Sequence, residues 1–304
     1  MRFSVVFPGQ GSQYVGMGKD IFSSLSHAKQ IFEEADDILS IRLSDICFNG
    51  PQETLVKTNI SQPAILVHSI ALLECYSQIH PEIKDSYSTC GLSLGEYTSL
   101  VFAGVVSFKD ALILVKHRGD LMQEACETKP GGMVCVVGLQ EFQVLETINE
   151  IKSPSTLNIA NINAPDQIVI SGLKESLDEI IPLIKKKGGR TITLKVAGAF
   201  HSFLMKSAEE KLSEKIKNTN FSSPRIPVIC NSKAEYLSDV NRIKEALVEQ
   251  LTSPVKWCSS IQNLLKDDVS TFYEIGPGTT LTGLLKRIDK NIKSLNIGKI
   301  EDIK

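Results

Sequence analysis

Residues 86–102 read SYSTCGLSLGEYTSLVF, and this stretch decides the fold. Apolar periodicity predicts a strand over 86–92 and a helix over 94–103. Between them lies GLSLG at 91–95, a G-x-S-x-G pattern in the strand-to-helix setting that a nucleophile elbow requires. Small flanking residues let a strained turn project the serine hydroxyl beyond the sheet edge. The stretch therefore predicts a nucleophile at Ser93, with an ordinary glycine-rich turn as the alternative.

On both sides of this stretch, apolar runs of strand length alternate with segments of helical spacing. Such alternation is typical of a mostly parallel sheet covered by helices on both faces. We expect an α/β-hydrolase-like large domain. The predicted strands are 2–7, 86–92, 226–230, 271–275 and 294–297. The predicted helices are 27–39, 63–78, 94–103, 108–126, 201–217, 240–251, 257–266 and 279–289.

The segment 131–196 has a different order of elements, β-α-β-β-α-β, which is that of a ferredoxin-like module. Its predicted elements are 133–138, 141–151, 157–162, 168–171, 174–187 and 190–195. The central hairpin is expected to turn at 163–166, where NAPD suits a tight turn. Glycines at 131, 132 and 198 are predicted hinges. We therefore expect a small ferredoxin-like domain at 131–196, inserted into a large α/β domain formed by 1–130 and 197–304.

Composition excludes several classes of protein. The chain has 304 residues, of which 42% are hydrophobic, so disorder is excluded. With 33 Lys and Arg against 35 Asp and Glu, the net charge of −2 provides no long-range field toward nucleic acid or an anionic membrane. Seven cysteines without a C-x-x-C pair indicate reduced core residues rather than disulfides or a zinc site.

Cellular location is predicted from two further features. The N-terminus runs directly into a predicted strand and lacks the pattern of a signal peptide. No apolar run reaches the roughly 18 residues of a membrane helix. We expect a cytoplasmic protein.

An activated serine needs a base, and the chain has five histidines. His201 is the best candidate, because it lies in GAFHS at a break between a predicted strand and helix, where a loop can reach the sheet edge. His27 lies in a polar helical stretch, His68 on an apolar helix face, and His80 in a loop before a proline.

No acidic residue in 94–200 is a clear partner for His201. A backbone carbonyl can take that role, because the imidazole Nδ1–H needs an acceptor rather than a charge. Helix C-termini expose unsatisfied carbonyls. The predicted helix ending near Gln250 and Leu251 supplies such groups.

Two other segments carry candidate chemistry. Arg118 lies in the middle of a predicted helix, where it is either a surface or ion-paired residue or a fork for a carboxylate. FPGQGSQ at 7–13 lacks the lysine and the glycine spacing of phosphate-binding loops. Its backbone N–H groups can instead form an oxyanion hole together with the N–H of Leu94.

Taken in order, these segments resemble the malonyl-CoA:acyl-carrier-protein transacylase family, over essentially the whole chain. The motifs are FPGQGSQYVGMG at 7–18, NISQPA at 59–64, GLSLGEY at 91–97, HRGDLMQ at 117–123, NINAPDQIVISG at 161–172, GAFHSFLM at 198–205, QLTSPVKW at 250–257 and EIGPGTTLTGL at 274–284.

The resemblance implies a role for each matching residue. Ser93 would be the acylated nucleophile, His201 its base, and the Gln250 carbonyl the group that orients the histidine. Arg118 would pair with the malonyl carboxylate, and the N–H groups of Gln10 and Leu94 would form the oxyanion hole. The remaining implied residues are Gln62, Asn161 and Asn163, which line the cleft, and Phe200, whose bulk favours malonyl over α-branched groups.

The resemblance also implies partners: malonyl-CoA and an acyl carrier protein, with no metal or redox cofactor. We expect a monomer. Because carrier proteins are usually acidic, a local basic rim is expected. Its candidates are Lys185, Lys186, Lys187, Arg190, Lys286 and Arg287, each of which can also be a simple solvated residue.

The sequence departs from the family at Leu92, where histidine is usual. An apolar residue there cannot hydrogen-bond the acyl group or water, which leaves the balance between malonyl and uncharged acyl groups open. The main alternative is therefore an editing hydrolase that releases acyl groups from carrier proteins in polyketide assembly. A catalytically inactive docking module and a generic esterase are further alternatives.

Overall fold

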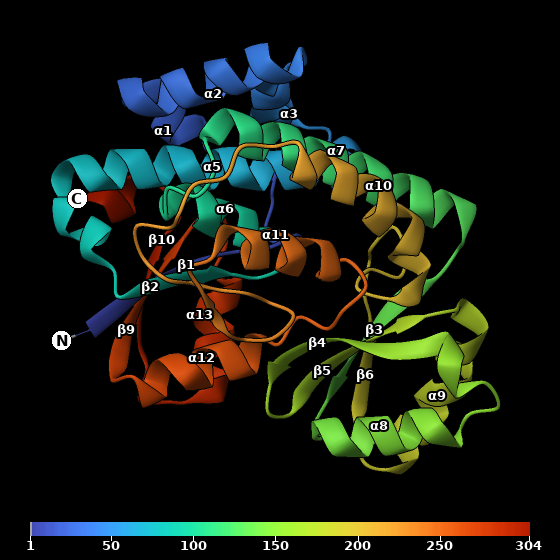
Figure 1. Cartoon of the computed structure of the whole chain (residues 1–304). Helices are drawn as coiled ribbons and strands as arrows, with labels where there is room; N and C mark the ends of the chain where they lie inside the picture. Colours follow the sequence, from blue (N-terminus) through green and yellow to red (C-terminus); the bar gives the residue numbers. More distant parts are fainter. Residues whose placement is uncertain (1) are drawn as a thin grey trace.

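The computed structural model describes residues 2–304, and a six-stranded sheet crosses it in the order β10-β9-β1-β2-β7-β8 (Figure 1). All neighbouring strands run parallel except β7 and β8. The prediction of an α/β fold on a mostly parallel sheet is confirmed. The strands are β1 (Arg2–Phe7), β2 (Ser88–Gly91), β7 (Val228–Ile229), β8 (Tyr236–Leu237), β9 (Val269–Ile275) and β10 (Lys293–Ile297).

Helices cover both faces of this sheet, because successive side chains of its strands point to opposite sides. In β1, Val5 and Phe7 join one apolar cluster, and Val6 joins another. The first cluster includes residues of α5 (Thr58–Ile79), α6 (Gly95–Phe102) and α7 (Phe108–Thr128). The second includes α12 (Trp257–Lys266) and α13 (Thr280–Ile288), below the sheet in Figure 1.

The remaining helices of the large part form an outer layer. Figure 1 shows α2 lying over α5, and α10 beside α7. These helices are α1 (Lys19–Ser24), α2 (Ser26–Leu39), α3 (Leu43–Asn49), α4 (Gln52–Leu55), α10 (Lys206–Lys217) and α11 (Val240–Glu249). Short 3-10 helices occur at Pro81–Asp85, Pro154–Thr156, Phe203–Met205 and Ile300–Ile303.

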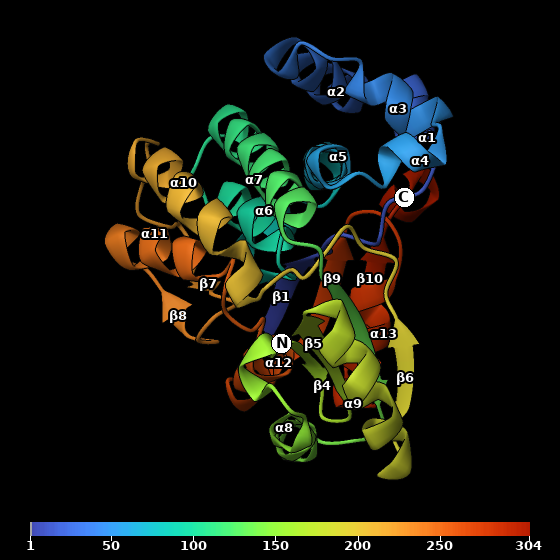
Figure 2. The same ribbon diagram turned by 90° about the vertical axis from the view of Figure 1, so that its right-hand side faces the viewer.

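A second, antiparallel sheet has the order β4-β5-β3-β6, with two helices on one face (Figure 2). Its elements are β3 (Gly132–Val137), α8 (Glu141–Glu150), β4 (Leu157–Ala164), β5 (Gln167–Gly172), α9 (Lys174–Lys186) and β6 (Arg190–Thr193). The sheet is tied to the large part at β4, where the Ile162 N–H donates to the Val255 carbonyl and the Val255 N–H donates to the Ala160 carbonyl. This tie brings the hairpin of β4 and β5 to the rim of the large sheet.

Most predicted elements agree with the structure within a few residues, and three differ. The predicted helix over 201–217 is wrong at its start, because α10 begins at Lys206. His201 has φ 55°, a left-handed conformation that no helix continues through. The predicted helix over 63–78 begins earlier, at Thr58. The central hairpin turns more tightly than predicted, since β4 runs through Ala164.

Two of the glycines that were predicted to be hinges, Gly131 and Gly198, have a packing role. A Cβ on Gly131 would lie 2.7 Å from the Gly172 carbonyl oxygen, and one on Gly198 would lie 2.4 Å from the Cys126 sulfur. Only glycine permits these close approaches.

Three further structural facts concern the cysteines, the apolar helices and the metal-ligating side chains. All seven cysteines are buried and unpaired. Across residues 2–304, no helix is both long enough and apolar enough to cross a membrane. In the same part of the chain, no three His, Cys, Asp or Glu side chains are grouped as a metal site would need.

His68, in α5, is fully buried with neither ring nitrogen hydrogen-bonded among the described residues. Burial lowers its pKa to about 4. Because the folded-state pKa lies below the unfolded value, the unfolded chain binds more protons as the pH falls, and stability is lost below about pH 6.5.

We predict that His68→Leu removes this loss. Between pH 7 and pH 5 the unfolding free energy of the variant should gain about 2 kcal/mol relative to wild type, measured by urea unfolding. His201 is present in both proteins and cancels in the difference. A difference that does not change with pH would contradict the prediction.

Candidate active site

The loop from β2 to α6 forms a sharp turn with Ser93 at its apex. Ser93 has φ 52°, which is strained for a residue with a side chain. A Cβ on Gly91 would lie 2.0 Å from the Gly95 carbonyl carbon, and one on Gly95 would lie 2.2 Å from the Phe7 carbonyl oxygen. Both glycines of the pattern are therefore required by close packing of the turn against itself and against β1.

Ser93, His201 and Gln250 form a chain of hydrogen bonds. Ser93 Oγ lies 2.8 Å from His201 Nε2, and His201 Nδ1 lies 2.8 Å from the Gln250 carbonyl oxygen. Because a carbonyl only accepts, Nδ1 carries the proton, and Nε2 of the neutral ring accepts from the serine hydroxyl. Gln250 directly follows α11, so its carbonyl is one of the free acceptors at a helix C-terminus.

The backbone around His201 is fixed by two hydrogen bonds, one from β4 and one within its own loop. The His201 carbonyl accepts from Asn158 Nδ2 at 2.8 Å, and the Ser202 hydroxyl donates to the Ala199 carbonyl at 2.6 Å. Burial and then the nearby Arg118 charge lower the pKa of His201 to about 4, while the bond to Gln250 opposes the shift. The imidazole is therefore neutral near pH 7 and able to accept a proton.

Arg118 reaches the same point from α7 and is 1% exposed. Its Nη2 donates to Ser93 Oγ and to Gln250 Oε1, each at 2.9 Å, and its Nη1 donates to Gln62 Oε1 at 2.6 Å. Its Nε has no hydrogen-bond partner among residues 2–304. The surface and ion-pair alternatives are therefore wrong for this residue: its Nη2 contacts the serine hydroxyl, and its Nε is a buried donor without a partner in the described residues.

Gln10 and Leu94 lie next to the elbow. Gln62 Nε2 lies 3.3 Å from Gln10 Oε1, which ties α5 to the loop after β1. That loop approaches closely, since a Cβ on Gly9 would lie 2.3 Å from the Leu92 carbonyl oxygen. In the described part of the chain, the backbone N–H groups of Gln10 and Leu94 donate to no other protein atom.

A cavity of ≈ 200 Å³ opens in front of Ser93 and His201. Phe200, Asn161 and Asn163 line it, as do Gln10 and Leu92. Apolar side chains complete its wall: Met122, Met133, Val169, Leu194, Val196 and Leu284. Of the predicted site residues, the cavity is thus lined by Gln10, Ser93, Asn161, Asn163, Phe200 and His201. The others, Gln62, Leu94, Arg118 and Gln250, each bond or directly follow one of these lining residues.

Two residues of the site were missed by sequence reasoning. The Ser93 N–H donates to Asn231 Oδ1 at 2.6 Å, and Glu96 accepts from Gln250 Nε2 at 2.6 Å. A signal existed for each. Asn231 directly follows a predicted strand that ends at the same sheet edge, and Glu96 is an acidic residue in an otherwise apolar helix start.

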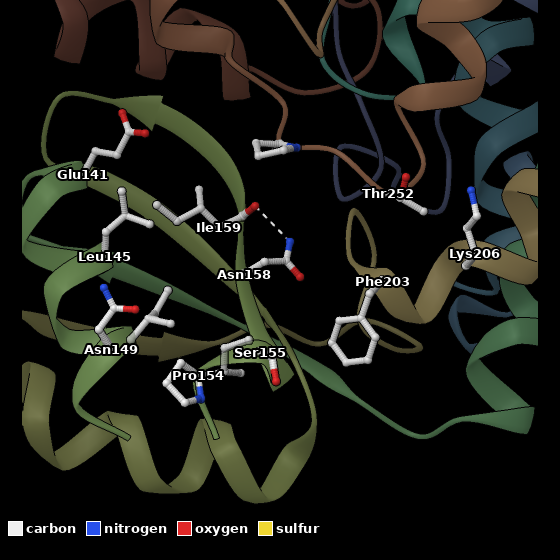
Figure 3. Close-up of a pocket in the computed structure, with 13 residues that line it drawn as sticks. Glu141, Leu145, Asn149, Pro154, Ser155, Asn158, Ile159, Phe203, Lys206 and Thr252 are labelled. Carbon is white, nitrogen blue, oxygen red and sulfur yellow. Dashed lines mark hydrogen bonds between the residues drawn. The ribbon is translucent and has the colours of Figure 1, made fainter. Parts of the chain in front are cut away.

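A larger hollow of ≈ 810 Å³ lies behind the histidine loop, between α8, the start of β4 and the segment after α11 (Figure 3). Leu145, Phe203 and Thr252 line it, and Ser93 and His201 do not. Asn158, whose side chain bonds the His201 carbonyl, borders it. The hydrogen-bonded Ser93 and His201 lie at the smaller cavity, which is therefore the candidate active site.

The sequence profile of the acyl transferase domain matches residues 4–300. The chain belongs to this family. It is 40% identical over 306 residues to the malonyl CoA-acyl carrier protein transacylase of Bacillus subtilis (strain 168), covering 99% of this chain and 95% of that protein.

Solved structures of family members superpose closely on this acyltransferase. The acyl-carrier-protein-S-malonyltransferase of Bartonella henselae matches with a TM-score of 0.96 and 38% identity, covering 100% of this chain and 97% of that one. A malonyl-transacylase in complex with a type II PKS acyl-carrier protein matches with a TM-score of 0.94 and 35% identity, covering 100% and 98%. The resemblance drawn from the motifs is therefore confirmed.

The close approach of the elbow to β1 leads to a prediction about the acyltransferase fold. Gly95→Ala should lower the unfolding free energy by about 2 kcal/mol, because the added methyl group would collide with the Phe7 carbonyl. Gly283→Ala, in α13, is the control: nothing lies within 4 Å of its Cβ position, and a helical alanine should add about 0.5–1 kcal/mol. Urea unfolding measures both, and equal stability of Gly95→Ala and wild type would refute the collision.

Proposed function

We propose that this acyltransferase moves the malonyl group of malonyl-CoA to the phosphopantetheine thiol of acyl carrier protein, through a malonyl ester of Ser93. The observation that carries the proposal is the buried Arg118 guanidinium, 2.9 Å from Ser93 Oγ and with its Nε unpartnered among the described residues. A buried cation with an unpaired donor favours an acyl group that itself carries a carboxylate. The names of the relatives support the same substrate pair.

In the first half-reaction, Ser93 Oγ attacks the thioester carbonyl while its proton passes to His201 Nε2. The carbon–sulfur bond then breaks, and the departing CoA sulfur takes the proton from His201. A malonyl-serine ester remains, with Arg118 paired to the free carboxylate.

In the second half-reaction, the carrier's thiol gives its proton to His201 and attacks the ester. The ester bond to Ser93 breaks, and the serine oxygen recovers the proton. The Gln250 carbonyl stabilises the imidazolium in both halves, because it accepts the Nδ1–H that the charged ring also donates.

The developing oxyanion would be bound by the unpartnered N–H groups of Leu94 and Gln10. Phe200 and the apolar wall of the cavity would restrict the α-carbon of the acyl group, while Asn161 and Asn163 line its polar side. Gln62 is buried and would act by holding Arg118 Nη1. Leu92 contributes no hydrogen bond to the acyl group, so Arg118 alone would select the carboxylate.

The carrier protein would approach over the basic residues predicted to form a rim. Two of them are ion-paired, Lys187 with Glu150 at 2.6 Å and Arg287 with Asp166 at 2.7 Å. Lys185, Lys186, Arg190 and Lys286 remain exposed. We further propose that the chain acts as a cytoplasmic monomer without a metal or redox cofactor.

For the architecture, we propose an α/β-hydrolase-like large domain at 1–130 and 197–304. We propose a ferredoxin-like small domain at 131–196. The strand order β4-β5-β3-β6 supports the second assignment.

Intact-protein mass after brief incubation with malonyl-CoA tests the function. We expect a malonyl adduct on wild type, absent in Ser93→Ala, that disappears when holo acyl carrier protein is added and reappears on the carrier. Acetyl-CoA should label far less. Rapid loss of either acyl group to water, with acetyl accepted as readily as malonyl, would instead make the protein an editing hydrolase.

The pH dependence of acylation tests the role of His201. Because only the neutral ring accepts the serine proton, and its pKa is lowered to about 4, kcat/KM for malonyl-CoA should stay level from pH 8 to about pH 5.5. An ordinary exposed histidine would lose half of this activity near pH 6.5. A single inflection near pH 6.5 in quenched-flow acylation rates would remove His201 from the role of buried base.

A further inference from the structure

Glu96 is a buried carboxylate beside the elbow that the proposed mechanism does not use. It lies in the first turn of α6 and is 3% exposed. None of the ion pairs within residues 2–304 includes it. A buried carboxylate without a cation in contact is costly, so its hydrogen bonds decide what it does.

One route from Glu96 leads to the arginine. Its Oε2 accepts from Gln250 Nε2 at 2.6 Å, and the other end of that carboxamide, Gln250 Oε1, accepts from Arg118 at 2.9 Å. Gln250 Nε2 also donates to the Ser93 carbonyl at 3.0 Å. The carboxamide of Gln250 therefore bridges an acidic and a basic side chain next to the nucleophile.

A second route leads to the elbow backbone. The same Glu96 oxygen accepts from the Asn231 N–H at 3.2 Å. The side chain of Asn231 accepts from the Ser93 N–H at 2.6 Å and donates to the Gly91 carbonyl at 2.7 Å. The N–H and the carbonyl of Ser93 are thus hydrogen-bonded to Asn231 and Gln250, respectively. Both of these residues are in turn hydrogen-bonded to Glu96.

Hydrogen-bond chemistry gives these contacts a direction. A guanidinium has only donors, so Gln250 must turn its oxygen toward Arg118 and its NH2 toward Glu96. Without an acceptor at the Glu96 position, Gln250 Nε2 keeps only its 3.0 Å bond to the Ser93 carbonyl. The carboxamide is then held less firmly, and the bond from Arg118 Nη2 to Gln250 Oε1 is weakened. A charged donor left unpaired in a buried site is expensive, so the guanidinium would shift.

We propose that Glu96 is a positioning residue of this transferase: by reaching the Gln250 carboxamide and Asn231, it aims Arg118 at the acyl carboxylate and holds the Ser93 turn. The proposal rests on the function proposed above. It assigns to Glu96 a role in choosing malonyl over uncharged acyl groups.

For this positioning role, the length of the Glu96 side chain matters more than its charge. Burial raises the pKa of Glu96 to about 7, against the opposing effects of Gln250, Asn231 and Arg118. Both protonation states are therefore present near neutral pH, and both offer an acceptor oxygen to Gln250.

Two conservative variants separate reach from charge. Glu96→Gln keeps the length and an acceptor oxygen but removes the charge. Glu96→Asp keeps the charge but withdraws the carboxylate by about 1.5 Å, beyond hydrogen-bond distance of Gln250. Ser99→Ala is the control: the Ser99 hydroxyl donates only to the Glu96 backbone carbonyl, so the variant perturbs the same turn of α6 and leaves the Glu96 carboxylate and its partners in place.

The measurement is kcat/KM for acylation of Ser93 by malonyl-CoA and by acetyl-CoA. In Glu96→Asp the malonyl-to-acetyl ratio should fall about tenfold, whereas Glu96→Gln should stay within about threefold of wild type. Ser99→Ala should keep the wild-type ratio. A general loss of folding would lower both rates and leave the ratio unchanged.

A wild-type ratio in Glu96→Asp, or an equal fall in Glu96→Asp and Glu96→Gln, would overturn the proposal. Failure of the proposed function has a different signature, because wild type itself would then accept acetyl as readily as malonyl. If Glu96→Asp does not fold, a loss of selectivity in Glu96→Gln would by itself refute the claim that reach suffices.

Discussion

The left-handed backbone at Ser93 is the constraint on which the rest of the site depends. With φ at 52°, the serine side chain points away from the sheet edge toward His201 and Arg118. Such a conformation persists only when its surroundings determine it. Here Gly91 and Gly95 provide the space, and hydrogen bonds from Asn231 and Gln250 hold the peptide groups on both sides of the serine.

A second constraint is the burial of charge. Arg118 lies almost completely out of water, so each N–H group that does not bind substrate must find an oxygen inside the protein. Carboxamides of Gln62 and Gln250 provide these oxygens without neutralising the cation. Glu96 is linked to Arg118 only through the Gln250 carboxamide. The guanidinium therefore bonds only neutral oxygens, and its Nε has no partner among residues 2–304.

The candidate site was largely predictable from the sequence, because local patterns carry its chemistry. The elbow pattern named Ser93, and the absence of a suitable acid pointed to a helix-end carbonyl, which is where His201 Nδ1 finds the Gln250 oxygen. Asn231 and Glu96 were not predicted. Their positions carried a local signal, but their roles arise from contacts across 135 residues or more of chain, and no local pattern specifies those partners. The start of α10 was misplaced for a related reason, since apolar spacing does not reveal a left-handed residue.

By itself, the sequence determined the order of strands and helices, the strained turn at residues 91–95 and the family to which the chain belongs. Short-range sterics and periodic burial of apolar side chains are sufficient for the elements and the turn, and shared motifs are sufficient for the family. The tertiary structure alone decided which side of α7 is buried against the elbow and which polar side chains converge on Arg118. The reason is that the pairing of parallel strands and the packing of helices on them bring distant residues within hydrogen-bond distance. The hydrogen-bond partners of the buried Arg118 guanidinium come from such distant residues.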